Sequence, residues 1–183
     1  MLLCKCSEIG CILWLTWLKT SSRKDLPEIS AVSCTPISPT RHFTQHVVVS
    51  YWGKNAVEIF ALTSNGLTSV HKVPELPSLV RSLLLYNFGT DPSPKGEDYQ
   101  PYLLVGLSDG TLVTFVWRDK EMKEKKLVSL GQAPITLAPC VVEGKRTILA
   151  AGNRAILVSF DRKRLHFSPV SLKVSLAPTT RVS

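Results

Sequence analysis

Two aspartates occupy positions where a catalytic carboxylate could lie, Asp109 in an Asp-Gly turn and Asp161 beside Arg162. General acid or base catalysis and glycoside hydrolysis need carboxylates that are gathered at one cavity. The sequence offers few candidates for such a group, and both aspartates suit a solvated turn. We therefore expect turn roles for them and no part in acid or base catalysis.

Motifs for a nucleophile or for phosphate binding are also missing from the sequence. Ser108 precedes Asp-Gly, which differs from the small-x-Ser-x-small elbow of hydrolases, and no GxxxxGKS loop occurs. The sequence therefore predicts no catalytic residues, no cofactor and no enzyme activity.

Histidines and cysteines do not have the spacing of a metal site. Structural zinc sites usually combine two closely spaced Cys or His pairs, and no second pair answers Cys4 and Cys6. An odd count of five cysteines argues against a disulfide framework. We expect no metal site, histidines satisfied at the surface or in the core, and buried free thiols in a reducing compartment. The residues concerned are His42, His46, His71 and His166, with Cys4, Cys6, Cys11, Cys34 and Cys140.

The chain is basic, with 22 Lys and Arg against 14 Asp and Glu, a net charge of +8. Such a charge suits nucleic acid, an anionic membrane surface or an acidic protein. Two predicted turns carry a candidate basic rim formed by Lys145, Arg146, Arg162, Lys163 and Arg164. If the two turns approach each other, this rim would bind phosphates or an acidic partner in a salt-sensitive way.

Aromatic and mixed-charge segments favour structural roles. Base stacking needs exposed aromatics interleaved with the cations, and these are missing. Trp52 and Trp117 lie at the ends of predicted strands, where we expect them to pack between sheets. The run from Arg118 to Lys126 alternates in sign, which predicts a solvated hairpin loop between two strands.

From Glu28 onward the chain reads as short extended runs separated by turns, with no convincing 3.6-residue periodicity. The sequence thus predicts an all-β chain. Twelve strands are predicted, at Ile29–Pro36, His46–Tyr51, Ala56–Leu62, Thr68–Val73, Leu79–Phe88, Tyr102–Leu107, Thr111–Trp117, Lys126–Leu130, Ile135–Val142, Arg146–Ala151, Ala155–Phe160 and Leu165–Val170.

Three apolar hairpins recur at intervals of roughly fifty residues, which is typical of propeller blades. They span Val47–Phe60, Leu103–Val116 and Ile148–Phe160. Each hairpin turn contains Gly or Asn, which favour left-handed backbone, and Asp109-Gly110 predicts a two-residue turn with positive φ at both centres. A Pro- and Gly-rich stretch at 89–100 is predicted to be a surface loop.

Several strands are apolar on both faces, as expected when each small sheet is sandwiched between neighbours. The predicted fold is a partial β-propeller of about three four-stranded antiparallel blades, at 25–76, 77–131 and 132–174. The first 24 residues are unassigned, and 175–183 form a tail. Within the first segment, Cys11–Leu18 is apolar but too short to span a bilayer, and we expect no membrane partner. Since propellers close with more blades, we expect a fragment with two open apolar faces.

A family resemblance appears in five segments that follow in order: PEISAVSCTPISP, LVRSLLLYNF, YLLVGLSDGTLVTF, KKLVSLGQAPITLAPC and ILAAGNRAILVSFDRKRLHFSPVSLK. The sequence resembles the damage-specific DNA-binding protein 1 family, which shares its architecture with a polyadenylation factor subunit and a splicing factor 3b subunit. The resemblance spans about Glu28 to Lys173 and leaves the first 24 residues unmatched.

The resemblance implies the middle propeller of a three-propeller protein that is nuclear and partly cytoplasmic. In that family the middle propeller docks the cullin-4 ubiquitin-ligase scaffold, and the outer propellers hold substrate receptors. We therefore expect a non-catalytic interaction scaffold, part of an adaptor in DNA-damage repair. The alternative is a nucleic-acid-binding subunit of an mRNA 3′-end processing or splicing complex.

Overall fold

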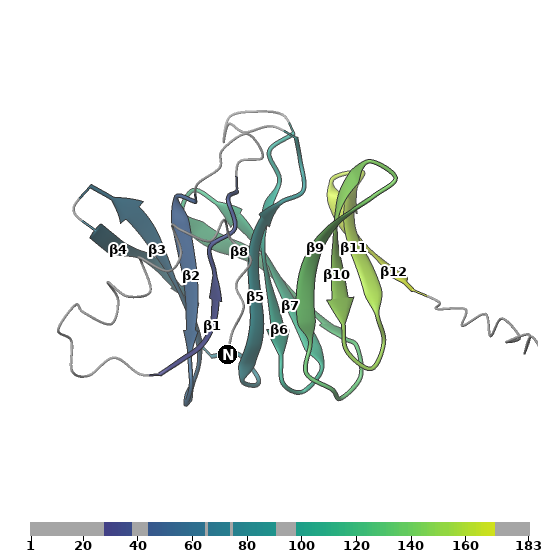
Figure 1. Cartoon of the computed structure of the whole chain (residues 1–183), viewed down its shortest axis with the longest axis horizontal. Coiled ribbons are helices and arrows are strands. Elements are labelled where there is room, and N and C mark those ends of the chain that lie inside the picture. Colours follow the sequence, from purple (N-terminus) through teal and green to yellow (C-terminus); the bar gives the residue numbers. More distant parts are fainter. Residues whose placement is uncertain (1–27, 38–43, 65, 74, 91–97, 171–183) are drawn as a thin grey trace, which may run out of the picture.

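The computed structural model describes residues 28–37, 44–64, 66–73, 75–90 and 98–170. Within these ranges the chain forms three four-stranded antiparallel sheets, which stand side by side as separate blades (Figure 1). The predicted all-β partial propeller is therefore confirmed. The expectations for residues 1–24 and 175–183, and for Cys4, Cys6, Cys11 and His42, fall outside the described residues.

Each sheet is a meander in which successive strands pair in sequence order. The strands are β1 (Ile29–Ser33), β2 (His46–Tyr51), β3 (Lys54–Thr63) and β4 (Gly66–Val73) in blade one; β5 (Val80–Asn87), β6 (Pro101–Leu107), β7 (Thr111–Arg118) and β8 (Glu121–Ser129) in blade two; and β9 (Thr136–Val142), β10 (Lys145–Ala151), β11 (Ile156–Asp161) and β12 (Arg164–Pro169) in blade three. The blade limits of 25–76, 77–131 and 132–174 stay as our proposal around these sheets.

The first strand of each blade lies on the inside of the arrangement, since β5 contacts both β1 and β9 (Figure 1). Blade two therefore sits between blades one and three. Within the described ranges we find no helix with the length and apolarity required to cross a bilayer.

The core is divided into two apolar interfaces, one on each side of blade two. In β6, Leu103 and Val105 point into the first interface, with blade one, whereas Tyr102 and Leu104 point into the second, with blade three. All seven residues of β6 are buried. Alternation along a strand thus explains why blade two is apolar on both faces.

Blades one and three each bury only one face against blade two. In β3, Val57 and Ile59 lie in the first interface, and Glu58 between them points to the opposite side. In β10, Ile148 and Ala150 lie in the second interface, and Leu149 between them is partly exposed. We call the outward side of blade three its open face.

The predicted solvated loop at 118–126 was wrong, because most of this run is strand. β8 begins at Glu121, five residues before its predicted start at Lys126, and only Asp119 and Lys120 form the turn. β8 is the outermost strand of blade two and is exposed along nearly its whole length. A strand with solvent on both sides needs no alternation of apolar and polar residues. The sequence of β8 therefore lacks the period-two pattern from which strands are predicted.

The predicted conformations of two hairpin turns were also wrong. In Asp109-Gly110 only Gly110 has a positive φ, of 81°, and neither Gly152 nor Asn153 has one. Instead, the Asn153 side-chain oxygen accepts hydrogen bonds from the backbone N–H groups of Gln132 and Ala133. This contact ties the β10–β11 turn to the connection between blades two and three.

A close approach at Gly106 provides a test of the second interface. The Ser82 hydroxyl donates to the Ile135 carbonyl over 2.7 Å beside this glycine. A Cβ atom at Gly106 would collide with that hydroxyl and lie 2.7 Å from the carbonyl oxygen. We expect Gly106→Ala to lower the free energy of unfolding by about 2 kcal/mol, measured by chemical denaturation.

The matched control is Gly152→Ala, since a Cβ atom there has its nearest neighbour 3.5 Å away, at the Ala133 carbonyl oxygen. We expect this variant to change the free energy of unfolding by less than about 0.5 kcal/mol. Equal effects of the two substitutions would contradict the account of Gly106.

Candidate interaction surface

Several hairpin turns lie at one end of the blades, which we call the upper end because it is uppermost in Figure 1. In blade three these are the β9–β10 turn, at Glu143-Gly144, and the β11–β12 turn, at Arg162-Lys163. All four of these residues have positive φ. Positive φ at both central residues is what a two-residue hairpin turn of type I′ requires.

The two turns predicted to carry a basic rim do lie at the same end of blade three. Strands β10 and β11 are antiparallel neighbours in which Ile148 is opposite Val158. Continuing this register places Lys145 opposite Asp161, which is itself paired with Arg164 on β12. The sheet therefore brings Lys145 close to Asp161 and Arg164, although they are separated in the sequence by the β10–β11 hairpin.

Arg146 does not share the exposed position of the other four cations. Its Nε donates to the Asn87 carbonyl oxygen over 2.8 Å, and its guanidinium lies 4.5 Å from the centre of the Tyr86 ring. Both partners belong to β5, so Arg146 joins blade three to blade two. The remaining four residues, Lys145, Arg162, Lys163 and Arg164, form what we call the cationic rim.

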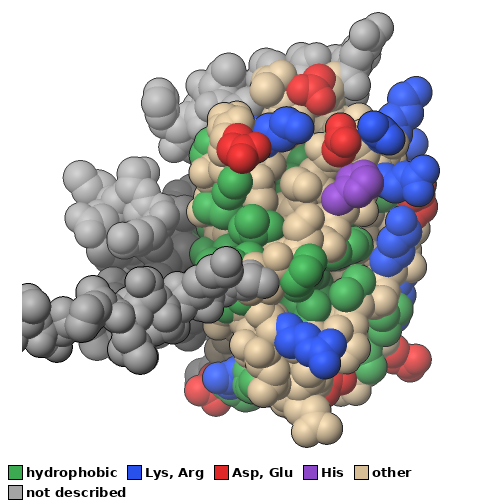
Figure 2. Space-filling view, turned by 90° about the vertical axis from the view of Figure 1, so that its right-hand side faces the viewer, with side chains coloured by type: hydrophobic (Ala, Val, Ile, Leu, Met, Phe, Trp, Pro, Cys, Tyr) green, Lys and Arg blue, Asp and Glu red, His purple; other side chains and the backbone are tan. Residues whose placement is uncertain are grey.

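The rim has little internal compensation from carboxylates. Arg162 Nε lies 3.9 Å from Asp161 Oδ2, and the two side chains are 88% and 58% exposed. Such an exposed pair at the distance limit contributes little. Figure 2 looks onto the open face and shows Lys and Arg side chains interspersed with Asp and Glu along its upper edge, around a histidine, with hydrophobic and further Lys and Arg side chains below.

The two aspartates singled out in the sequence are exposed, Asp109 in a turn and Asp161 at the last residue of β11, directly before a turn. Asp109 Oδ1 accepts the Thr111 backbone N–H over 2.9 Å, which closes the β6–β7 turn. Asp161 lies at the end of β11, and its carbonyl oxygen is 3.1 Å from Nε2 of His166. The two aspartates are at opposite ends of their blades, because β6–β7 and β11–β12 turn at opposite ends. The structure thus does not bring them together.

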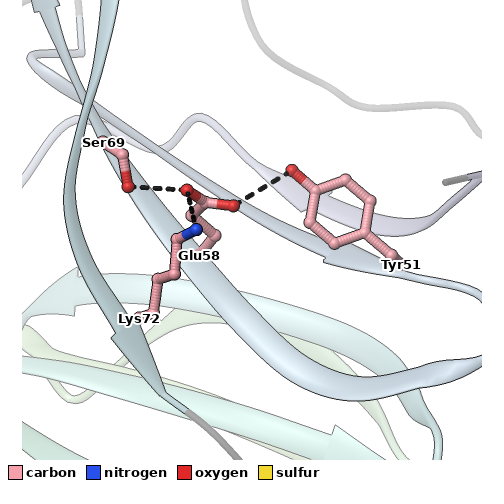
Figure 3. A network of polar contacts seen from close by, with 4 residues as sticks. All are labelled: Tyr51, Glu58, Ser69 and Lys72. Atoms are coloured by element: carbon pink, nitrogen blue, oxygen red, sulfur yellow. Dashed lines mark hydrogen bonds and ion pairs between the residues drawn. The ribbon is translucent and has the colours of Figure 1, made fainter. Parts of the chain in front are cut away.

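A carboxylate network in blade one was not recognised from the sequence (Figure 3). Glu58 accepts hydrogen bonds from the Ser69 hydroxyl at 2.6 Å and the Tyr51 hydroxyl at 3.5 Å, and its Oε1 lies 3.3 Å from Lys72 Nζ. Burial, together with the charge and hydrogen bond of Glu58, raises the pKa of Tyr51 to about 12. Tyr51 therefore remains a proton donor at neutral pH.

This network joins β2, β3 and β4 on the side of blade one that faces away from blade two. Both oxygens of Glu58 are engaged and its side chain is only 17% exposed. These contacts of Glu58 hold the three strands in register, which is a structural role. In the sequence, the only indication of this network was the alternation of Glu58 with the apolar Val57 and Ile59, which places Glu58 on the opposite side of the strand.

Histidines, tryptophans and cysteines differ in how well they match expectation. Trp117 is 5% exposed and packs in the first interface, as predicted, with the His46 and His71 rings edge-on to it. Trp52 is 39% exposed and has Arg81 of β5 over its ring, so it contacts the neighbouring blade without being buried between the sheets. Cys34 and Cys140 are partly exposed and not buried, contrary to expectation. Among the described residues we find no group of three or more His, Cys, Asp and Glu able to hold a metal ion.

Comparison with known proteins gives a match to one family model over residues 16–180, described as the RSE1/DDB1/CPSF1 second beta-propeller. The chain belongs to this family. The match starts within the first 24 residues, where the resemblance in the five segments does not reach. The description as a second propeller agrees with the expected middle propeller.

Individual relatives support the assignment. The chain is 31% identical over 149 residues to "DNA damage-binding protein 1a" of Arabidopsis thaliana and 26% identical over 159 residues to "DNA damage-binding protein 1" of Drosophila melanogaster. These matches cover 80% and 85% of the chain but only 13% of each relative. The chain is also 28% identical over 133 residues to "Splicing factor 3B subunit 3" of Drosophila melanogaster, covering 64% of the chain and 11% of that relative.

Arg146 provides a test of the contact between blades two and three. Replacing Arg146 with Ala removes both the hydrogen bond to Asn87 and the cation–π contact with Tyr86. We expect a loss of about 1–2 kcal/mol in the free energy of unfolding. Lys145→Ala, one residue away and exposed, is the matched control and should change it by less than about 0.5 kcal/mol. Equal losses would show that Arg146 is not a contact between blades.

His46 gives the first interface a dependence on pH. Burial, aided by nearby Lys120, lowers the pKa of His46 below its ordinary value of 6.5. Its buried Nδ1 has no hydrogen-bond partner among the described residues, so the expectation of satisfied histidines was wrong for His46. The folded state thus favours neutral His46. Its contribution to stability is complete above pH 6.5 and is lost as the pH falls from 6.5 through the lower folded-state pKa.

We expect His46→Phe to flatten the fall in the free energy of unfolding below pH 6.5. Denaturant titrations at a series of pH values measure this. The prediction fails if wild type and variant lose stability in parallel on acidification.

Proposed function

We propose that this chain is part of a non-catalytic protein-interaction scaffold, within an adaptor that links a cullin-4-type ubiquitin ligase to substrate receptors in DNA-damage repair. The observation that carries the proposal is the family match to the second propeller over residues 16–180. Likeness to proteins named for DNA damage binding adds support. The proposed location is the nucleus, with some protein in the cytoplasm.

The structure suits such a role because it offers turns and loops held by rigid sheets. The strands pair in regular ladders, and two apolar interfaces keep the blades together. Binding residues on the connections are then presented in a fixed arrangement, with a few anchors supplying most of the affinity. A carboxylate bound on both oxygens, as Glu58 is, also fits a structural task better than proton transfer.

Recovery of a cullin-4 N-terminal segment by the purified chain tests the proposal. We expect the immobilised 183-residue chain to retain this segment and not the corresponding segment of another cullin. Cooperative melting of the same preparation must first show that the chain is folded. A folded chain that retains both segments equally, or neither, contradicts the cullin-4 assignment.

A second candidate is a nucleic-acid-binding subunit of an mRNA 3′-end processing or splicing complex. The likeness to "Splicing factor 3B subunit 3" and the net charge of +8 favour it. Filter binding of RNA across a salt series is the discriminating measurement, because phosphate contacts weaken as salt rises. Absence of salt-dependent binding would remove this candidate.

A further inference from the structure

Two residues of the cationic rim have a backbone conformation that their side chains do not favour, as Asp119 and Lys120 also do in the β7–β8 turn. Arg162 has φ of 46° and Lys163 has φ of 65°, in a turn where Asn-Gly would be most favourable. Long side chains in the left-handed region carry a free-energy cost, and such positions cluster at functional sites. The identity of these two residues is therefore not explained by the needs of the turn.

The charge at this end of blade three is positive. Four cations stand against two carboxylates, Glu143 and Asp161, which leaves +4 − 2 = +2. The one ion pair between them among the described residues is Arg162 with Asp161, at 3.9 Å. Most of the rim charge is therefore available to a partner.

The rim remains accessible if another sheet covers the open face. Arg162 and Lys163 form the β11–β12 turn, and Lys145 and Arg164 are the first residues of β10 and β12, so all four lie at the end of the blade and not at its centre. Arg162, Lys163 and Arg164 are all exposed.

The rim lacks the features that would suit bases. Phe160 and Phe167, the aromatic residues nearest in the sequence, pack against the second interface. The exposed Trp52 lies on blade one, in the β2–β3 turn at the opposite end. Among the described residues, the rim therefore has no Phe, Tyr or Trp beside it as a platform for base stacking, and the nearby His166 has its Nε2 3.1 Å from the Asp161 carbonyl oxygen. Carboxylates and backbone phosphates both need only the cations.

We propose that the cationic rim, formed by Lys145, Arg162, Lys163 and Arg164, binds an acidic segment of a partner protein. The choice of a protein as the partner rests on the proposed scaffold function. Binding of an acidic segment at the rim does not require binding of a cullin. The rim proposal and the cullin-4 assignment can therefore be tested separately.

Substitutions in the turn can remove the charge without endangering the fold. The triple variant R162N/K163G/R164Q deletes three cations and installs Asn-Gly, the preferred pair for this turn, so thermal stability should be retained or raised. The matched control is K123Q/K125Q/K126Q, which deletes three exposed cations from β8 of blade two. Both variants have the same net charge.

The experiment measures fluorescence anisotropy with a labelled peptide of alternating Glu and Ser, using the complete 183-residue chain. We expect the rim variant to weaken binding about tenfold and the β8 variant to change it by less than about twofold. Equal weakening by the two variants would show a nonspecific charge effect, and absence of peptide binding to the wild type would overturn the proposal. Rim-dependent binding of single-stranded RNA or duplex DNA that is tighter than that of the peptide would overturn it in favour of nucleic acid.

Retention of the cullin-4 segment is measured on the same rim variant. Loss of peptide binding with the segment retained supports the rim as a separate surface. If the wild type binds the peptide but retains no cullin segment, only the adaptor assignment fails. If it retains the segment but does not bind the peptide, only the rim proposal fails.

Discussion

The structure depends on covering an apolar sheet from both sides. Every residue of β6 is buried, and successive side chains enter different interfaces. A single four-stranded blade cannot provide this, because its own strands lie in one layer. Blade two is stable only between blades one and three, so the chain must fold as a stack of at least three sheets.

Polar contacts then fix how the stacked blades meet. Arg146 joins β10 to β5 through Asn87 and Tyr86, and the Ser82 hydroxyl reaches the Ile135 carbonyl where Gly106 leaves room. These contacts are directional, whereas apolar burial is not. They set the relative position of the sheets and therefore the spacing of the turns at their ends.

An interaction scaffold needs such fixed ends more than it needs a pocket. The upper end of blade three carries its positive charge in the β11–β12 turn, at Arg162 and Lys163, and on the first residues of β10 and β12. Arg146 is not part of the rim, because its guanidinium contacts Asn87 and Tyr86 of blade two. A partner protein therefore cannot bind this cation in the same way as the four exposed ones. The remaining cations stand at the end of the blade, and three of them, Arg162, Lys163 and Arg164, lie in or directly after the β11–β12 turn.

Much of this protein was determined by its sequence, because strand periodicity and turn residues are local signals. The twelve strands, their grouping in fours and the two-sided burial of blade two all follow from them. Local signals failed for β8, whose charges face solvent on both sides, and for Asn153, whose side chain bonds to a connection some twenty residues away.

Only the tertiary structure decided which cations form the rim. Lys145 and Arg146 are adjacent and both cationic, but alternation along β10 points them to opposite sides of the sheet. Arg146 then meets Tyr86 of the neighbouring blade, about sixty residues earlier in the chain. A contact between sheets depends on how they are stacked, and no spacing within the sequence specifies that.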